Sequence, residues 1–139
     1  MTMHFECALC QESGGEILGE DALCRVVLVD EPGYPGFCRV ILNRHVAEMS
    51  DLSESERATL MQRVFAVETV IRDTLNPDKI NLASLGNVVP HVHWHVIPRW
   101  RDDRHFPNPI WTAPSRPDAV VSVTPAQLAE LQQRIGALF

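Results

Sequence analysis

The sequence has no long apolar run and few basic residues. No stretch of about 18 or more apolar residues occurs, so no membrane-spanning helix is expected. Met1–Glu6 holds no basic segment followed by an apolar one, so we expect no signal peptide and a cytoplasmic location. Lysine and arginine number 12 against 18 acidic residues, which gives a formal net charge of −6. This balance argues against binding of a nucleic acid polymer, which needs a basic stripe, but allows a small nucleotide.

Cysteine is also scarce, at four of 139 residues, and two of the four lie in Cys7-Ala8-Leu9-Cys10. Without a secretion signal, a disulfide framework is a poor interpretation of these residues. A metal site, a redox pair and buried reduced thiols are all compatible with the Cys-x-x-Cys spacing. Cys24 and Cys38 lie in apolar segments and are predicted to be core residues.

The candidate functional residues are densest in Pro90-His91-Val92-His93-Trp94-His95-Val96-Ile97-Pro98, which holds three of the six histidines. Histidine alternates here with apolar residues, and alternation with period two predicts a strand. On a strand, His91, His93 and His95 share one face and the apolar residues share the other. Neighbouring rings are then about 6–7 Å apart. The segment therefore predicts a row of imidazoles on the face turned away from the core.

Apolar patterning and turn residues predict four further strands, at residues 16–18, 23–29, 37–42 and 79–84. Ser53 and Glu56 form a capping box for a long helix that ends at Asn76-Pro77. Thr124-Pro125 begins a short C-terminal helix. Strands, one long helix and strands again predict a single α+β domain over residues 1–139, with the helix on one face of an antiparallel sheet.

Three imidazoles on one strand suggest two chemistries. His-x-His on a strand can bind zinc with a third ligand, which would make the histidine row a catalytic metal centre. Alternatively, one neutral imidazole attacks phosphorus while its other ring nitrogen holds a proton against a fixed acceptor. Neighbouring donors would then stabilise the equatorial phosphate oxygens. Ordinary surface histidines on a half-buried strand explain the alternation poorly.

His91-Val92-His93-Trp94-His95-Val96-Ile97 resembles the His-φ-His-φ-His-φ-φ motif, with φ apolar, of the histidine triad (HIT) superfamily. The resemblance runs from about Cys7 to Trp111, and Trp94–Asp103 with Pro107–Trp111 is similar to bacterial members described as diadenosine tetraphosphate hydrolase-like. It implies a HIT-like α+β core over about residues 7–111, a C-terminal extension over 112–139 and a symmetric homodimer. The apolar face of the long helix, which is wider than a small sheet covers, favours the same homodimer.

The resemblance also implies an activity. It is hydrolysis or nucleotidyl transfer at the α-phosphate of a dinucleoside polyphosphate or nucleoside phosphoramidate, through a nucleotidyl-histidine and without an organic cofactor. His93 would be the nucleophile and His95 would contact the phosphate. His91 would support the site, and its main-chain carbonyl would accept a hydrogen bond from His93. Asp30 would bind the ribose hydroxyls, and Asn81 would lie near the phosphates.

The loop before the triad departs from the family pattern. Many members carry Gly-Gln followed by Ser or Thr, whereas this chain has Gly86-Asn87-Val88-Val89. Asn87 can still donate a hydrogen bond to substrate, but the Val88 side chain cannot. The departures support an alternative, a nucleotide-binding or interaction module with little turnover. Arg99 is also expected to reach substrate phosphates, although a solvated charged loop explains it equally well.

The same resemblance implies a structural zinc site. Some triad proteins and related uridylyltransferases bind zinc through a Cys-x-x-Cys pair, a histidine after the second hairpin strand and the first histidine of the triad. The matching residues are Cys7, Cys10, His45 and His91, which would form a closed Cys2His2 site. Zinc there would leave the other two triad histidines for phosphate chemistry. A reduced, partly buried cysteine pair is the alternative.

Overall fold

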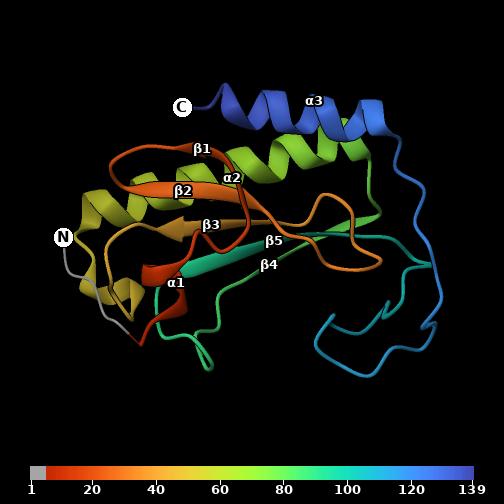
Figure 1. The fold of residues 1–139 in the computed structure, drawn as a ribbon, viewed down its shortest axis with the longest axis horizontal. Helices are drawn as coiled ribbons and strands as arrows, with labels where there is room; N and C mark the ends of the chain where they lie inside the picture. Colours follow the sequence, from red (N-terminus) through yellow and green to blue (C-terminus); the bar gives the residue numbers. More distant parts are fainter. Residues whose placement is uncertain (1–5) are drawn as a thin grey trace.

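The computed structural model describes residues 6–139 as an α+β fold (Figure 1). The strands are β1 Glu16–Glu20, β2 Cys24–Leu28, β3 Cys38–Leu42, β4 Lys79–Ala83 and β5 His93–Arg99. The helices are α1 Ala8–Gln11, α2 Glu54–Leu75 and α3 Pro125–Gly136, with a 3-10 turn at Met49–Asp51. Among residues 6–139, no helix combines the length and the hydropathy that a membrane span requires. The expectation of no signal peptide rests on residues that lie almost wholly outside the described ones.

The five strands form one sheet in the order β1-β2-β3-β5-β4, and every neighbouring pair is antiparallel. This confirms the predicted antiparallel sheet. Helix α2 connects β3 to β4, and β5 lies between these two strands. The histidine strand therefore occupies an interior position of the sheet, where hydrogen bonds on both sides fix its register.

Helix α2 begins and ends where its sequence signals predict. The Ser53 side chain accepts from the Glu56 backbone N–H, and the Glu56 side chain accepts from the Ser53 backbone N–H. At the other end Asn76 adopts a left-handed conformation, with φ at 48°, directly before Pro77. The helix lies against β3 and β5 and buries one apolar stripe against the sheet, formed by Leu60, Val64, Val67, Val70, Ile71 and Leu75.

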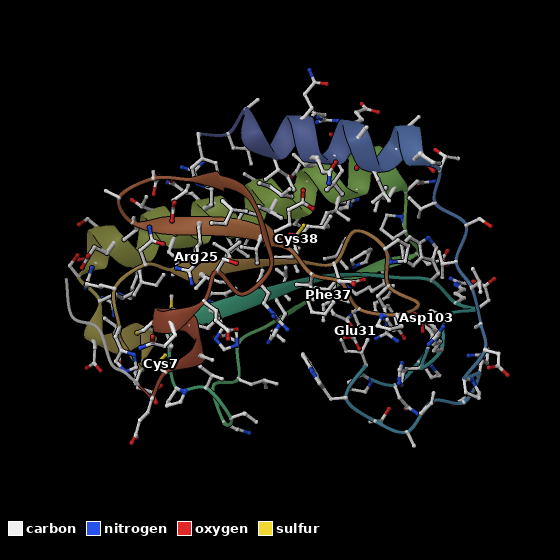
Figure 2. The ribbon with its side chains drawn as sticks, viewed as in Figure 1. Cys7, Arg25, Glu31, Phe37, Cys38 and Asp103 are labelled. Atoms are coloured by element: carbon white, nitrogen blue, oxygen red, sulfur yellow. The ribbon has the colours of Figure 1, made fainter. Side chains whose placement is uncertain are left out.

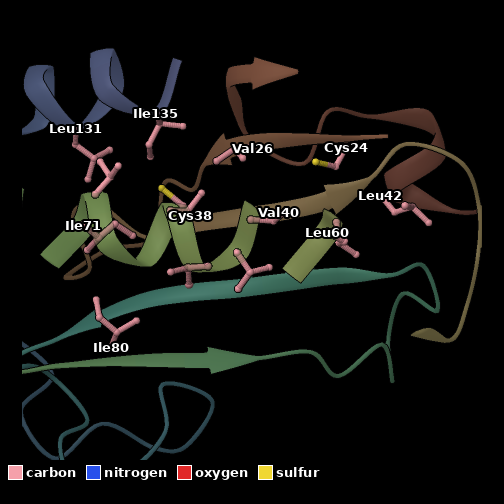
Figure 3. Close-up of a cluster of buried hydrophobic side chains, with 14 of the residues drawn as sticks. Cys24, Val26, Cys38, Val40, Leu42, Leu60, Ile71, Ile80, Leu131 and Ile135 are labelled. Carbon is pink, nitrogen blue, oxygen red and sulfur yellow. The ribbon is translucent and has the colours of Figure 1, made fainter. Parts of the chain in front are cut away.

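Helix α3 lies along α2 and also contacts β1, so two helices cover the same side of the sheet (Figure 1). Its Leu131 and Ile135 are fully buried in the main core, together with Cys24 and Cys38 (Figure 3). The prediction of both cysteines as core residues is confirmed, and burial raises the pKa of Cys38 to about 12. The C-terminal helix therefore shares the core with α2, while Phe65 of α2 stays 51% exposed.

The opposite face of the sheet carries the polar residues. Because side chains alternate along a strand, Arg25 of β2, Arg39 of β3, and His93 and His95 of β5 all point away from α2. Helix α1 and the loops cover this face (Figure 1). The structure differs from prediction at one triad position, since β5 begins at His93 and His91 precedes the strand.

A buried ion pair ties the segment after β5 to the sheet. The Arg99 guanidinium donates to Asp103 at 2.8 and 3.1 Å, and the two side chains are only 2% and 0% exposed. Asp103 also accepts from the backbone N–H groups of Trp100, His105 and Phe106. A solvated loop at Arg99 is therefore the wrong interpretation, because this charge is buried and paired within the fold.

Asp103 should make the stability of the chain sensitive to acid. Burial by itself raises the pKa of Asp103, but hydrogen bonds from Arg99 and from three backbone N–H groups outweigh it and lower the pKa from 3.8 to about 2. A carboxyl group with a lowered pKa stabilises the folded state above its ordinary pKa, and that contribution is lost as pH falls through the folded value. We predict that about 2 kcal/mol of unfolding free energy is lost through Asp103 between about pH 5 and pH 2.

Denaturant unfolding over this pH range tests the prediction. The Asp103→Asn variant should be less stable at neutral pH, since it leaves Arg99 buried without its partner. Its unfolding free energy should also fall less between about pH 5 and pH 2 than that of the unaltered chain. Asp102→Asn, at an exposed neighbouring position, is the control and should keep the original pH dependence. The same acid response in both variants would contradict the assignment.

Candidate active site

His93 and His95 open onto a cavity of about 450 Å³. Strands β3 and β5 form its floor, and α1, the loop before the triad and the segment after β5 form its walls. Its lining residues are Ala8, Leu9, Glu12, Arg39, Leu85, Gly86, Asn87, Val88, Val89, His93, His95 and Trp111. The cavity has room for a phosphate group and part of a nucleotide, so the two histidines meet a space that a substrate can enter.

His93 is held in one tautomer by the main chain. Its Nδ1 lies 2.6 Å from the carbonyl oxygen of His91, which can only accept, so Nδ1 carries the proton. Its Nε2 therefore keeps a lone pair. Burial lowers the pKa of His93, an effect that its hydrogen bond to the His91 carbonyl opposes and the charge of Arg39 reinforces. The ring is thus neutral near pH 7 and has a free nitrogen, the two conditions for a nucleophilic imidazole.

His95 lies beside His93 and has the opposite hydrogen-bonding character. Its ring centroid is 4.9 Å from that of His93 and 5.0 Å from that of Trp111. The Nε group of Arg39 donates to Nδ1 of His95 at 3.4 Å, which leaves the proton of the neutral ring on Nε2. Burial, followed by the influence of His93 and Arg39, lowers the pKa of His95 to about 4. His95 therefore offers an N–H donor next to the lone pair of His93.

A second cluster holds two thiols and two imidazoles. One ligand atom from each of Cys7, Cys10, His45 and His91 lies within 4.8 Å of the others. The His91 Nδ1 is 3.4 Å from the sulfur of Cys7 and 3.6 Å from that of Cys10, and the His45 Nδ1 is 3.4 Å from Cys10. In a tetrahedral zinc site, Zn–S and Zn–N bonds of ordinary length separate sulfur from nitrogen by about 3.5 Å. These four residues therefore fit a tetrahedral metal ion.

The Leu42 carbonyl and the Arg25 side chain lie outside this cluster and orient its members. The Nε2 of His91 donates to the Leu42 carbonyl at 2.6 Å, so its Nδ1 directs a lone pair at the thiols. Arg25 is buried and donates to main-chain carbonyls of the loop around Cys10, at Leu9, Glu12 and Ser13. Figure 2 shows Cys7 and Arg25 at the same end of the sheet, next to α1. The sheet thus holds the cysteine loop through β2 and the first histidine through the end of β3.

The other predicted site residues are more dispersed. Asn87 lines the triad cavity and is exposed, and its neighbour Val88 is 93% exposed. Asp30 is exposed and lines a separate cavity of about 680 Å³. The Asn81 side-chain oxygen accepts from Arg99 at 2.7 Å, and neither residue lines the triad cavity. Substrate contacts at Asp30, Asn81 and Arg99 therefore stay predictions.

Three residues at these sites were not predicted from the sequence. Arg25 supports the cysteine loop, Arg39 lies against His95, and Trp111 lines the triad cavity and is 51% exposed. The two arginines had a signal, because each is the single charge in an otherwise apolar strand, Cys-Arg-Val-Val-Leu and Cys-Arg-Val-Ile-Leu. Such a charge is costly to bury and needs partners. Trp111 had no such signal, since it lies in an irregular segment.

Curated relatives are similar to this chain in sequence. The chain is 32% identical over 98 residues to the AP-4-A phosphorylase of Mycobacterium tuberculosis, which covers 66% of this chain and 50% of that protein. It is also 32% identical over 102 residues to the adenosine 5'-monophosphoramidase of Schizosaccharomyces pombe, over 67% of this chain and 74% of the relative. This chain spans about half the length of the phosphorylase, so the activity of the longer protein does not transfer directly.

Solved structures share the fold. A histidine triad protein, blr8122, from Bradyrhizobium japonicum superposes with a TM-score of 0.75 at 26% identity, over 97% of this chain and 99% of that one. A Zn-bound histidine triad family protein from Mycobacterium smegmatis gives a TM-score of 0.64 at 18% identity, over 96% and 95% of the two chains, which supports the fold alone. The family model of the HIT domain matches residues 11–102. With the triad, the fold and this match in agreement, the chain belongs to the HIT domain family.

Proposed function

We propose that this chain is a nucleotide hydrolase or nucleotidyl transferase that attacks an α-phosphate with His93. The observation that carries the proposal is the 2.6 Å hydrogen bond from His93 Nδ1 to the His91 carbonyl, which leaves Nε2 free. The cavity beside His95 provides the space for the phosphate. The names of the relatives, a phosphorylase of a dinucleoside polyphosphate and a nucleoside phosphoramidase, support both substrate classes.

The proposed reaction has two displacements. The lone pair of His93 Nε2 forms a nitrogen–phosphorus bond, and the bond from phosphorus to the leaving phosphate or amine breaks with its electron pair, a leaving amine taking up a proton from solvent. Water, which gives up a proton to solvent, or an acceptor phosphate then attacks the same phosphorus, and the nitrogen–phosphorus bond breaks with its electron pair returning to Nε2, which releases the nucleotide and restores the neutral imidazole. His95 would donate Nε2–H to a phosphate oxygen as negative charge grows there. Asn87 would donate to the leaving group, and Asp30 would bind the ribose hydroxyls.

We predict that His93→Asn lowers kcat/KM by at least about a thousandfold, because it removes the nucleophile while keeping a polar side chain of modest size. The measurement is steady-state hydrolysis of a dinucleoside tetraphosphate and of an adenosine phosphoramidate, with circular dichroism as the check on folding. His105→Asn, at a histidine outside the cavity, is the control and should keep activity. Turnover by His93→Asn at the rate of the unaltered chain would rule out covalent catalysis by this residue.

Tight nucleotide binding by the unaltered chain without turnover would favour a binding module instead.

We also propose that Cys7, Cys10, His45 and His91 bind one structural zinc. The tetrahedral spacing of their ligand atoms supports this, as does the hydrogen bond from His91 to the Leu42 carbonyl. Zinc, when bound, would cross-link α1 to the segment before β5. All four cysteines of the chain are unbridged thiols, which suits the reducing cytoplasm as the proposed location.

Metal analysis of freshly purified protein tests the zinc proposal. We expect about one zinc per chain in the unaltered protein and a large loss in Cys7→Ser, since one of four ligands is missing. The midpoint temperature of thermal unfolding should be lower in Cys7→Ser as well, because the binding free energy of a structural metal contributes to folding. Cys24→Ala, a core cysteine, is the control and should keep its zinc. Unaltered protein that is free of metal before any chelator treatment would refute the site.

A homodimer completes the proposal. Phe65 on α2 is 51% exposed, and β4 lies at an edge of the sheet, so both offer surface to a second copy. We predict a sedimenting species of twice the 15.6 kDa of one chain. Phe65→Glu should shift the equilibrium toward monomer, because it places a charge in an apolar contact. A monomer for the unaltered chain at all tested concentrations would refute the dimer.

A further inference from the structure

Arg39 is a charged residue in β3, a strand whose other side chains are all buried in the core. The other four residues of β3 are Cys38, Val40, Ile41 and Leu42, and all four are fully buried. Arg39 is directly opposite His95 in the β3–β5 pairing, so both side chains lie on the same face of the sheet. A half-buried guanidinium in such a strand lowers stability unless an interaction compensates, and an aliphatic residue would fit there at lower cost.

Within residues 6–139 no carboxylate forms an ion pair with Arg39, although the charge of Glu31 acts on it from farther away. Its Nε donates to Nδ1 of His95 at 3.4 Å and its Nη1 donates to the Gly14 carbonyl at 3.1 Å. These two bonds use two of the five N–H donors of a guanidinium. The described ion pairs, which involve Arg44, Arg63, Arg99 and Arg134, do not include Arg39. The side chain is therefore positioned by neutral groups and keeps its charge and several donors.

The charge of Arg39 is directed to the triad cavity. Arg39 is the one lysine or arginine among the described residues that line this cavity, and Glu12 is the one acidic group. A phosphoryl group carries at least one negative charge, and an in-line attack spreads that charge over its equatorial oxygens. Arg39 lies opposite His95 and is therefore the cation placed to meet that charge.

We propose that Arg39 donates hydrogen bonds to a non-bridging oxygen of the phosphate that His93 attacks, and is thus a further substrate-binding and catalytic residue. The proposal rests on the proposed function. It assigns Arg39 to the nucleoside 5'-phosphate unit common to both substrate classes, not to the base or ribose. Arginine suits this role because its planar fork makes paired, charge-assisted hydrogen bonds to phosphate.

The test compares AMP with adenosine, which differ by the phosphate alone. Isothermal titration on the unaltered chain should show tighter binding of AMP. In Arg39→Leu, the dissociation constant for AMP should rise about 10- to 100-fold, as expected for lost hydrogen bonds to a charged group, while that for adenosine stays within about twofold. Arg39→Lys should recover part of the AMP affinity. Arg57→Leu, an exposed position on α2 with the same charge change, should bind both ligands normally.

The outcomes separate this inference from the proposed function. If the unaltered chain prefers AMP and Arg39→Leu keeps the whole preference, Arg39 does not bind phosphate and the inference alone is wrong. An equal loss for AMP and adenosine would mean a structural role and would also refute it. If the unaltered chain shows no preference for AMP, both the inference and the proposed function fail. Arg39→Gln, which keeps a polar side chain, is measured in parallel so that a folding defect in Arg39→Leu does not decide the result.

Discussion

The site depends on one hydrogen bond, from Nδ1 of His93 to the main-chain carbonyl of His91. It fixes which nitrogen of His93 carries the proton and therefore which nitrogen can attack phosphorus. The carbonyl is itself held in place, because the His91 ring donates to the Leu42 carbonyl and lies among the thiols of Cys7 and Cys10. The orientation of the His93 ring is thus set by the main chain at His91.

This arrangement gives the histidines of the motif separate functions. His91 lies before β5, buried against the cysteine loop, whereas His93 and His95 lie on β5 and open onto the cavity. In the proposed zinc site, the metal would hold His91 and so stabilise the carbonyl that orients His93. Arg39 lies opposite His95, and in the proposed complex it would contribute the positive charge that meets the phosphate. A structural site and a reactive site would therefore take their histidines from one short segment, His91–His95.

Much of the fold could be predicted from local sequence patterns. The features that were not predicted depend on tertiary contacts. The capping box at Ser53 and the left-handed Asn76 bound α2 as predicted, because these signals act within one turn of the chain. The departure of His91 from the strand depends on groups distant in sequence, and period-two alternation carries no such information. Arg99 was predicted to reach substrate phosphates, with a solvated loop as the alternative, and neither prediction included its buried ion pair, since sequence does not show that Asp103 folds back on it. Arg39 could have been singled out from the sequence as a lone charge in an apolar strand. Its contact with His95 could not, because that contact depends on how β3 and β5 pair.

In the proposed mechanism, the reaction proceeds through a covalent bond between His93 and the nucleotide. The stereochemistry at phosphorus tests it most directly, because each in-line displacement inverts the configuration. Hydrolysis of a substrate with a chiral α-thiophosphate in isotopically labelled water should give overall retention, the result of two displacements. Inversion would show that water attacks phosphorus directly, as expected if the triad served a catalytic metal, and would contradict the account.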